Sequence, residues 1–120
     1  MQIDKKIWQC VAGFNGFVAI VMGAIAAHAL ADTHMAAMAE KASLYQLIHA
    51  VLLLWLADRK GQFFTFARYL FLAGIILFCG TLYIKALTGW ALVNKLAPTG
   101  GMSFMAGWLM IVIGSYKDKA

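Results

Sequence analysis

Long apolar stretches, separated by short polar ones, run through the whole chain. Residues 7–30 contain no Asp, Glu, Lys or Arg, and about 20 apolar residues are enough for a helix to cross a bilayer. Further apolar stretches follow in the second, third and fourth quarters of the sequence. This pattern predicts an all-α fold, a four-transmembrane-helix bundle with short loops. It forms one integral membrane domain, residues 1–120, with spans at about 7–30, 35–57, 63–87 and 98–116.

The second of these spans has the least regular pattern. Its apolar part, residues 44–57, is too short to cross a bilayer comfortably. The preceding residues 35–41 are rich in Ala and Met, which favour helix. Either Asp32 or Thr33 can cap a helix that begins here, because each side chain accepts a hydrogen bond from free backbone N–H groups. We therefore expect an interfacial helical segment before the second span.

The connection to the fourth span is also polar. Residues 90–97, which include Asn94 and Lys95, have the composition of an interfacial segment. Pro98 suits the first turn of a helix, where its missing N–H leaves no bond unmade. Together with Gly100 and Gly101, it predicts a turn leading into the fourth span.

Composition supports a membrane location. The chain is 63% hydrophobic and 12% charged, whereas soluble domains average about 45–50% apolar and about 25% charged residues. The net charge of +5 does not indicate a nucleic-acid partner, because the basic residues lie at the ends of apolar stretches. Cys10 and Cys79 lie in different stretches without metal-ligand spacing, and we interpret both as small apolar residues. A cleaved signal peptide is the alternative for the first stretch, which is long for one.

The distribution of basic residues predicts an orientation. Four spans place both termini and the middle turn on one side of the membrane. That side carries more basic residues than the other, so the positive-inside rule predicts that both termini are cytoplasmic. The richer side holds Lys5, Lys6, Arg59, Lys60, Arg68, Lys117 and Lys119, and the other holds Lys41, Lys85 and Lys95.

Several polar residues lie deep within the first two spans. Tyr45, Gln46 and His49 project from one side of a helix, and polar groups at that depth are costly unless they are paired. Asn15 and His49 each lie about 12 Å from the cytoplasmic end of their helix. We therefore predict an intramembrane polar layer in which Asn15 and His49 hydrogen-bond directly or through water. Its members are Asn15, Tyr45, Gln46 and His49.

His49 has several possible roles. It could relay protons, ligate haem or a metal, donate to a bound ligand, or be a packed histidine satisfied by its neighbours. Haem is disfavoured because His28 lies about 20 Å away along the bundle, and we expect no cofactor and no metal site. His28 and Lys85 could form an outer polar cluster with Glu40 or Asp32, unless Lys85 reaches the headgroups instead. No catalytic constellation is visible, so we expect no enzyme.

Small residues recur at helical spacing in the first and last spans. Gly16 and Gly23 belong to a ridge in the first span, and Ser103, Gly107 and Gly114 share a face of the fourth. Such faces let helix backbones approach closely in lipid. They predict packing within the bundle or between subunits, with membrane lipids and a second copy of the chain as expected partners. The glycines assigned to helix packing are Gly16, Gly23, Gly80 and Gly107.

Four motifs in order resemble a known family. They are GAIAAHAL at 23–30, YQLIHA at 45–50, GIILFCGTLY at 74–83 and PTGG at 98–101, with Trp108 downstream. Together they resemble the YgdD/YwdK-like family of small four-helix membrane proteins, a domain of unknown function. This chain departs from the family pattern at Ile25, Ala26, Ala29, Cys79 and Thr81.

The resemblance implies location and topology without an established activity. It implies a bacterial inner membrane or an organelle membrane, of which we favour the bacterial inner (plasma) membrane. It also implies that certain positions are special, although no catalytic role comes with them. These positions are His28, Tyr45, His49, Gly80, Tyr83, Pro98, Gly100, Gly101 and Trp108.

Two function classes remain open from the sequence, and a third is disfavoured. The first is a non-enzymatic helix bundle that acts as an oligomer or support subunit. The alternative is a small transporter, channel or ligand-binding protein, which predicts a hydrated or ligand-filled pocket around His49. A membrane enzyme or redox protein is disfavoured because no second catalytic group lies at matching depth. The sequence does not indicate a small-molecule ligand, the number of subunits or a physiological partner.

Overall fold

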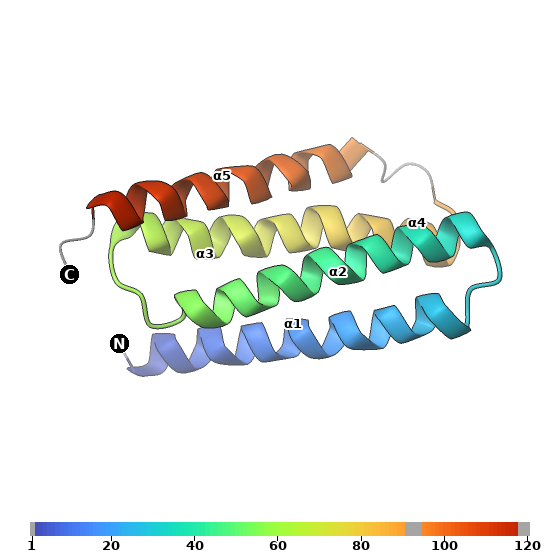
Figure 1. Ribbon diagram of the computed structural model, residues 1–120, viewed down its shortest axis with the longest axis horizontal. Coiled ribbons are helices and arrows are strands. Elements are labelled where there is room, and N and C mark those ends of the chain that lie inside the picture. Colours follow the sequence, from blue (N-terminus) through green and yellow to red (C-terminus); the bar gives the residue numbers. More distant parts are fainter. Residues whose placement is uncertain (1, 91–94, 118–120) are drawn as a thin grey trace.

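The computed structural model describes residues 2–90 and 95–117 and confirms the all-α prediction. Three rods are formed by α1 (Gln2–His28), α2 (Thr33–Leu56) and α5 (Leu96–Lys117). The remaining rod, which we call the third rod because it comes third along the chain, is continuous and consists of α3 (Gln62–Gly74), the π-helix η1 (Ile75–Cys79) and α4 (Gly80–Thr88). The rods lie side by side and give the molecule extents of 50 × 25 × 18 Å (Figure 1).

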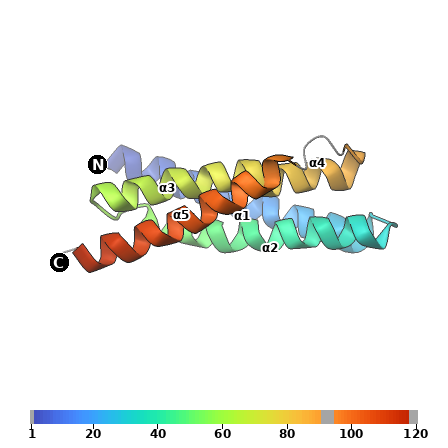
Figure 2. The same ribbon diagram turned by 90° about the horizontal axis from the view of Figure 1, so that it is seen from above.

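Three of these rods are long and apolar enough to cross a membrane, namely Asp4–His28, Gln62–Thr88 and Leu96–Lys117 in the described residues. The predicted span at 35–57 does not have this support. The physical reason is that α2 carries charged and polar residues, including Glu40, Lys41 and His49. The helix nevertheless packs against α1, α3, η1 and α4 (Figures 1 and 2). Its inward polar side chains therefore face other helices.

Local signals place the helix ends close to the predicted positions. The Asp32 side chain accepts a hydrogen bond from the backbone N–H of Met35, which confirms the predicted cap of α2. α2 is one unbroken helix that includes the predicted interfacial segment. Gly61 (φ 112°) and Gly89 (φ 77°) adopt positive φ values at the start of α3 and the end of α4, a conformation that glycine adopts without steric cost.

The start of α5 also agrees with the sequence. Pro98 lies in its first turn, as predicted. Residues 91–94, including Asn94, lie outside the described residues, so the predicted interfacial segment at 90–97 is only partly described. The start of α1, the turn between α2 and α3, and the end of α5 all lie at the same end of the bundle (Figure 1). We call this the terminal end.

The π-helix changes the direction of side chains midway along the third rod. The N–H of Gly80 donates to the carbonyl of Ile75, five residues earlier. Thr81 partly compensates for the altered backbone pattern, because its hydroxyl donates to the Leu77 carbonyl at 2.7 Å and lies 3.1 Å from that of Phe78. One inserted residue rotates everything that follows by about 100° around the helix axis. The π-helix therefore sets which residues of α4 face α2.

Glycines of α5 and aromatic rings of the third rod interlock along a seam. A Cβ added at Gly107 would lie 2.5 Å from a ring carbon of Phe71, and one added at Gly114 would lie 3.2 Å from Phe64. Phe104 of α5 reciprocally packs against Gly74. We call this set the glycine–phenylalanine seam. It consists of the pairs Gly100–Phe78, Gly74–Phe104, Gly107–Phe71 and Gly114–Phe64.

The other glycines assigned to helix packing differ in their surroundings. A Cβ added at Gly23 would lie 2.9 Å from the Ser43 hydroxyl of α2, so this glycine does bring two helices together. Gly16 has open space where its side chain would be, and the nearest atom to such a Cβ at Gly80 is a backbone oxygen of its own rod. Of the four, Gly107 and Gly23 pack within the chain and Gly16 faces outward.

Candidate functional site

A hydrogen-bonded chain of side chains joins α1, α2 and α4 inside the bundle. The amide nitrogen of Gln46 donates to the side-chain oxygen of Asn15 at 2.9 Å. The hydroxyl of Tyr83 donates to the side-chain oxygen of Gln46 at 2.6 Å. The Asn15 amide nitrogen in turn donates to the Val11 carbonyl one helical turn earlier. Asn15 and Gln46 are buried, so their polar groups are paired where lipid could not pair them.

His49 lies in a separate aromatic setting between α2, α3 and α5. Its ring stacks on Phe104 with centroids 3.8 Å apart and an interplanar angle of 11°. Phe71 lies 5.1 Å away, and Trp108 meets the ring edge-on at 6.0 Å. With only 4% of its surface exposed, the imidazole is enclosed by rings.

The hydrogen bonds of His49 define its tautomer. The indole N–H of Trp108 can only donate, so the His49 Nε2, 3.2 Å away, accepts. Nδ1 lies 2.6 Å from the Tyr45 carbonyl, which can only accept, so Nδ1 carries the proton. Both ring nitrogens are thus occupied in a neutral imidazole. Of the roles considered for His49, this geometry matches the packed histidine.

Asn15 and His49 form no direct hydrogen bond with each other in the described residues. Both residues are buried, but Asn15 bonds to Gln46 and His49 bonds to Trp108. Gln46 and His49 lie on adjacent turns of α2 but contact different helices. The predicted polar layer is therefore divided into two separate hydrogen-bond networks. The Tyr45 side chain belongs to neither hydrogen-bond chain, and its ring packs 5.0 Å from that of Phe78.

Residues missing from the predicted polar layer also join the helices. Tyr83 was singled out only by the family resemblance, yet it completes the chain through Gln46. The Ser43 hydroxyl of α2 donates to the Ala19 carbonyl of α1, and Ser103 of α5 donates to the Leu70 carbonyl of α3, both at 2.6 Å. A serine among small residues in an apolar helix is a usable signal for such contacts.

The predicted outer cluster is not brought together. In the described part of the chain, no hydrogen bond or ion pair joins His28 to Lys85, Glu40 or Asp32; His28 is exposed at the end of α1. Nor do any three His, Cys, Asp or Glu side chains among the described residues gather as metal ligands.

A shallow groove lies on the outside of the Gln46–Tyr83 contact. It has a volume of about 430 Å³ and opens between α1, α2 and the third rod. Its lining is almost entirely apolar, with Val18, Ile76 and Ile84 among its walls and Gln46 and Tyr83 at its polar part. The groove thus lies directly beside the hydrogen bond between Gln46 and Tyr83.

The comparisons with known proteins agree on one family. The model of the family "Protein of unknown function (DUF423)" matches residues 22–101. A UPF0382 membrane protein of Staphylococcus aureus (strain bovine RF122 / ET3-1) is 34% identical over 118 residues, covering 93% of this chain and 97% of that protein. A UPF0382 membrane protein of Staphylococcus saprophyticus is 35% identical and covers 93% of this chain and 98% of its own.

The match extends beyond staphylococci. The UPF0382 inner membrane protein YgdD of Escherichia coli (strain K12) is 34% identical over 115 residues, which cover 90% of this chain and 88% of YgdD. No solved structure matches. These matches confirm the family resemblance seen in the four motifs, and with the three apolar rods they identify an integral membrane protein. The chain belongs to the DUF423 family of UPF0382 membrane proteins.

Proposed function

We propose that this protein is a non-enzymatic helix bundle that acts through its outer surface, as a homo-oligomer or a support subunit within the membrane. One observation carries the proposal: the buried polar side chains of the central helices are hydrogen-bonded to other side chains or to backbone carbonyls of the same chain. Gln46 serves Asn15 and Tyr83, and both His49 nitrogens are bonded. A transporter or enzyme would instead need polar groups held available for a substrate.

The proposal includes α2 as a fourth membrane-crossing helix. A helix can carry polar groups across a bilayer when they are paired inside a bundle. Gln46 and His49 meet this condition, and α2 lies alongside α1 along its length (Figure 1). Its return also explains why α1 and α3 both begin at the terminal end.

The outer face of α1 is the surface best suited to a second copy. Phe14 and Phe17 are each 67% exposed, and Ile20 is 62% exposed. Gly13 and Gly16 leave open space between these side chains, which lets another helix approach closely. The glycines of α5, by contrast, are largely occupied in the glycine–phenylalanine seam.

Native mass spectrometry of the protein released from lipid nanodiscs tests this arrangement. We expect the wild-type chain to give a defined oligomer and Gly16→Leu to shift it to monomer, because the added side chain fills the contact. Gly101→Leu is the matched control, since Gly101 also has open space around it but lies on α5. A monomeric wild type, or an unchanged oligomer in Gly16→Leu, would contradict the proposal.

The groove beside Gln46 and Tyr83 favours a second candidate function. A small transporter or ligand-binding protein would use this groove to take up a membrane-soluble molecule with a hydrogen-bonding group. The same spectra would then show a stoichiometric small-molecule adduct. Loss of that adduct in Gln46→Leu would favour the binding function over the oligomer or support function. Loss in His49→Ala would instead indicate a site around His49. Spectra with ordinary phospholipid alone would remove this candidate.

A further inference from the structure

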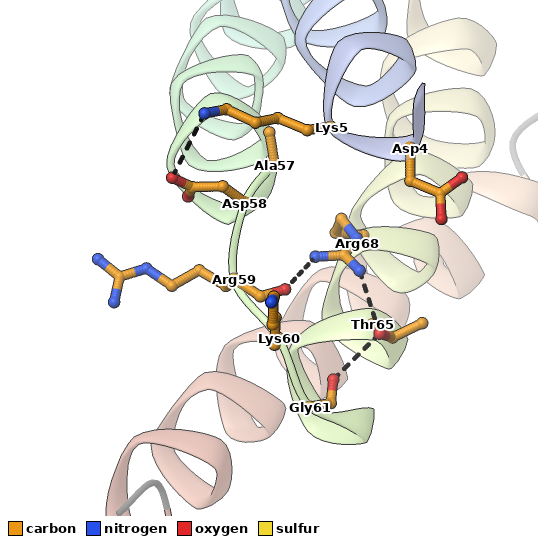
Figure 3. Close-up of a pocket in the computed structure, with 9 residues that line it drawn as sticks. All are labelled: Asp4, Lys5, Ala57, Asp58, Arg59, Lys60, Gly61, Thr65 and Arg68. Atoms are coloured by element: carbon orange, nitrogen blue, oxygen red, sulfur yellow. Dashed lines mark hydrogen bonds and ion pairs between the residues drawn. The ribbon is translucent and has the colours of Figure 1, made fainter. Parts of the chain in front are cut away.

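A basic recess lies at the terminal end of the bundle, outside both buried networks. It has a volume of about 450 Å³ and is formed by the start of α1, the turn after α2 and the first turns of α3 (Figure 3). Four basic side chains against two carboxylates give it an excess of two positive charges. Its charged lining residues are Asp4, Lys5, Asp58, Arg59, Lys60 and Arg68.

Arg68 is held rigidly on one side of this recess. One terminal nitrogen donates to the Leu56 carbonyl at 2.7 Å. The same nitrogen donates to the Arg59 carbonyl at 2.9 Å, and the other terminal nitrogen donates to the Thr65 hydroxyl at 3.1 Å (Figure 3). The guanidinium therefore caps the C-terminal end of α2, where a positive charge interacts favourably with the helix dipole. These neutral acceptors hold the guanidinium in place without cancelling its charge, which interacts favourably with the carboxylate of Asp4.

The other cations are only weakly engaged. Lys5 extends from α1 toward Asp58, with the charged atoms 4.0 Å apart and both side chains substantially exposed (Figure 3). Exposed ion pairs of this kind contribute little to the stability of a protein. Lys60 has no hydrogen bond or ion pair within the described residues. Arg59 turns away from Arg68, and its guanidinium lies 4.0 Å from the Trp55 ring centroid. An anion could therefore recruit Lys5 and Lys60 without breaking a strong contact.

An apolar groove lies further along α3 than this recess. Tyr69 follows Arg68 in the chain, and its ring meets Trp8 edge-on with centroids 5.2 Å apart. Tyr69 also lines a groove of about 440 Å³ between α3 and α5, with Phe66, Leu70, Ala73 and Met110. α3 therefore carries residues of a basic recess in its first turns and residues of an apolar groove in the turns that follow. This order matches a phospholipid, which carries a phosphate above its acyl chains.

We propose that the recess binds the phosphate of an anionic phospholipid headgroup, with an acyl chain of that lipid in the groove beside Tyr69. Lys60 and Lys5 approach the phosphate, and the fixed charge of Arg68 orients it. The lipid would anchor the terminal end of the bundle at the membrane surface. This proposal needs only the membrane location of the chain and does not depend on oligomer formation.

Native mass spectrometry from nanodiscs of equimolar phosphatidylcholine and phosphatidylglycerol tests the proposal. The wild-type chain is expected to retain phosphatidylglycerol preferentially. Lys60→Glu should lower the retained ratio of phosphatidylglycerol to phosphatidylcholine at least about fivefold, since each basic residue near an anionic surface contributes roughly a factor of this size. Lys117→Glu makes the same charge change at the same end but outside the recess, and it should leave the ratio unchanged.

Two further measurements separate a lipid from soluble phosphate and from general surface charge. Ala73→Phe fills the apolar groove without changing charge and should also reduce phosphatidylglycerol retention; full retention would overturn the two-part site. Inorganic phosphate titrated calorimetrically onto the protein in phosphatidylcholine nanodiscs should give no saturable heat, and tight binding there would assign the recess to soluble phosphate instead. Equal losses in Lys60→Glu and Lys117→Glu would mean non-specific charge and would also overturn the proposal.

Discussion

Gln46 is the residue on which the polar groups of three helices depend. Its amide nitrogen donates to Asn15 and its amide oxygen accepts from Tyr83, so both polar atoms of the side chain are hydrogen-bonded. Interhelical hydrogen bonds in membrane proteins average only about 0.6 kcal/mol and reach about 1.7 kcal/mol. The more important consequence is specificity, because only one rotation of α2 brings the amide to both partners. Gln46 therefore contributes to the choice of one arrangement of the bundle.

Removing Gln46 should destabilise the protein measurably. Gln46→Leu leaves the Asn15 oxygen and the Tyr83 hydroxyl without their partner, and we expect a loss of about 1–2 kcal/mol in the free energy of unfolding. Tyr83→Phe removes a single bond and should cost about 0.6 kcal/mol. Unfolding by SDS titration in mixed micelles measures both. If Tyr83→Phe costs the same in the Gln46→Leu background as in the wild type, the two residues are not coupled.

At the scale of elements, the glycine–phenylalanine seam is the main contact between α5 and the third rod. Lipid gives helices no hydrophobic reason to associate, so close packing at small residues becomes decisive. The seam extends from Gly114 near the terminal end to Gly100 beside the π-helix. At Gly100, an added Cβ would meet the backbone of Phe78. The absence of a side chain at this position therefore lets α5 pack directly against the backbone of the π-helix.

Two alanine substitutions on α5 separate packing from helix propensity. A Cβ at Gly107 would meet the Phe71 ring, whereas one at Gly101 would meet nothing within 4 Å. Both changes favour helix by up to about 1 kcal/mol, but overpacking costs about 1–3 kcal/mol. Gly107→Ala is therefore expected to unfold at lower SDS fraction than wild type, and Gly101→Ala at equal or higher SDS fraction. The reverse order would mean that the seam does not determine stability.

At the scale of the whole molecule, the bundle has chemically different ends. The terminal end carries the basic recess, with Arg59, Lys60 and Arg68 close together and Lys117 on α5. The opposite end has Gly89 and the connection between α1 and α2. By the positive-inside rule, this asymmetry favours the terminal end in the cytoplasm. In the proposed topology α2 also crosses the membrane, because an uneven number of crossings would place the termini on opposite sides.

Reporter fusions test this topology directly. A fluorescent protein fused at either terminus should fluoresce in cells, while alkaline phosphatase fused there should be inactive, because both termini are expected in the cytoplasm. Alkaline phosphatase inserted between α1 and α2, at residues 30–32, should be active. Activity at one terminus and not at the other would show that only an odd number of helices crosses the membrane.

The sequence by itself determined the features that arise from local chemistry. Hydropathy predicted the three apolar rods, together with a fourth span at 35–57 that does not have the same support. Asp32 or Thr33 marked the start of α2, and Pro98 marked the first turn of α5. The four motifs identified the family. These features depend on the solvent that a segment requires and on backbone groups within one turn, so neighbouring residues are enough to indicate them.

Only the tertiary structure decided which residues meet. Depth along a helix suggested Asn15 and His49 as partners, but hydrogen bonding also depends on the rotation of each helix. The π-helix turns α4 by about 100°, and Tyr83 consequently reaches Gln46. Likewise, small residues at the same spacing place Gly107 in an internal seam and Gly16 on an open face. Rotation and register arise from the packing of all the rods together, and no single stretch of sequence contains them.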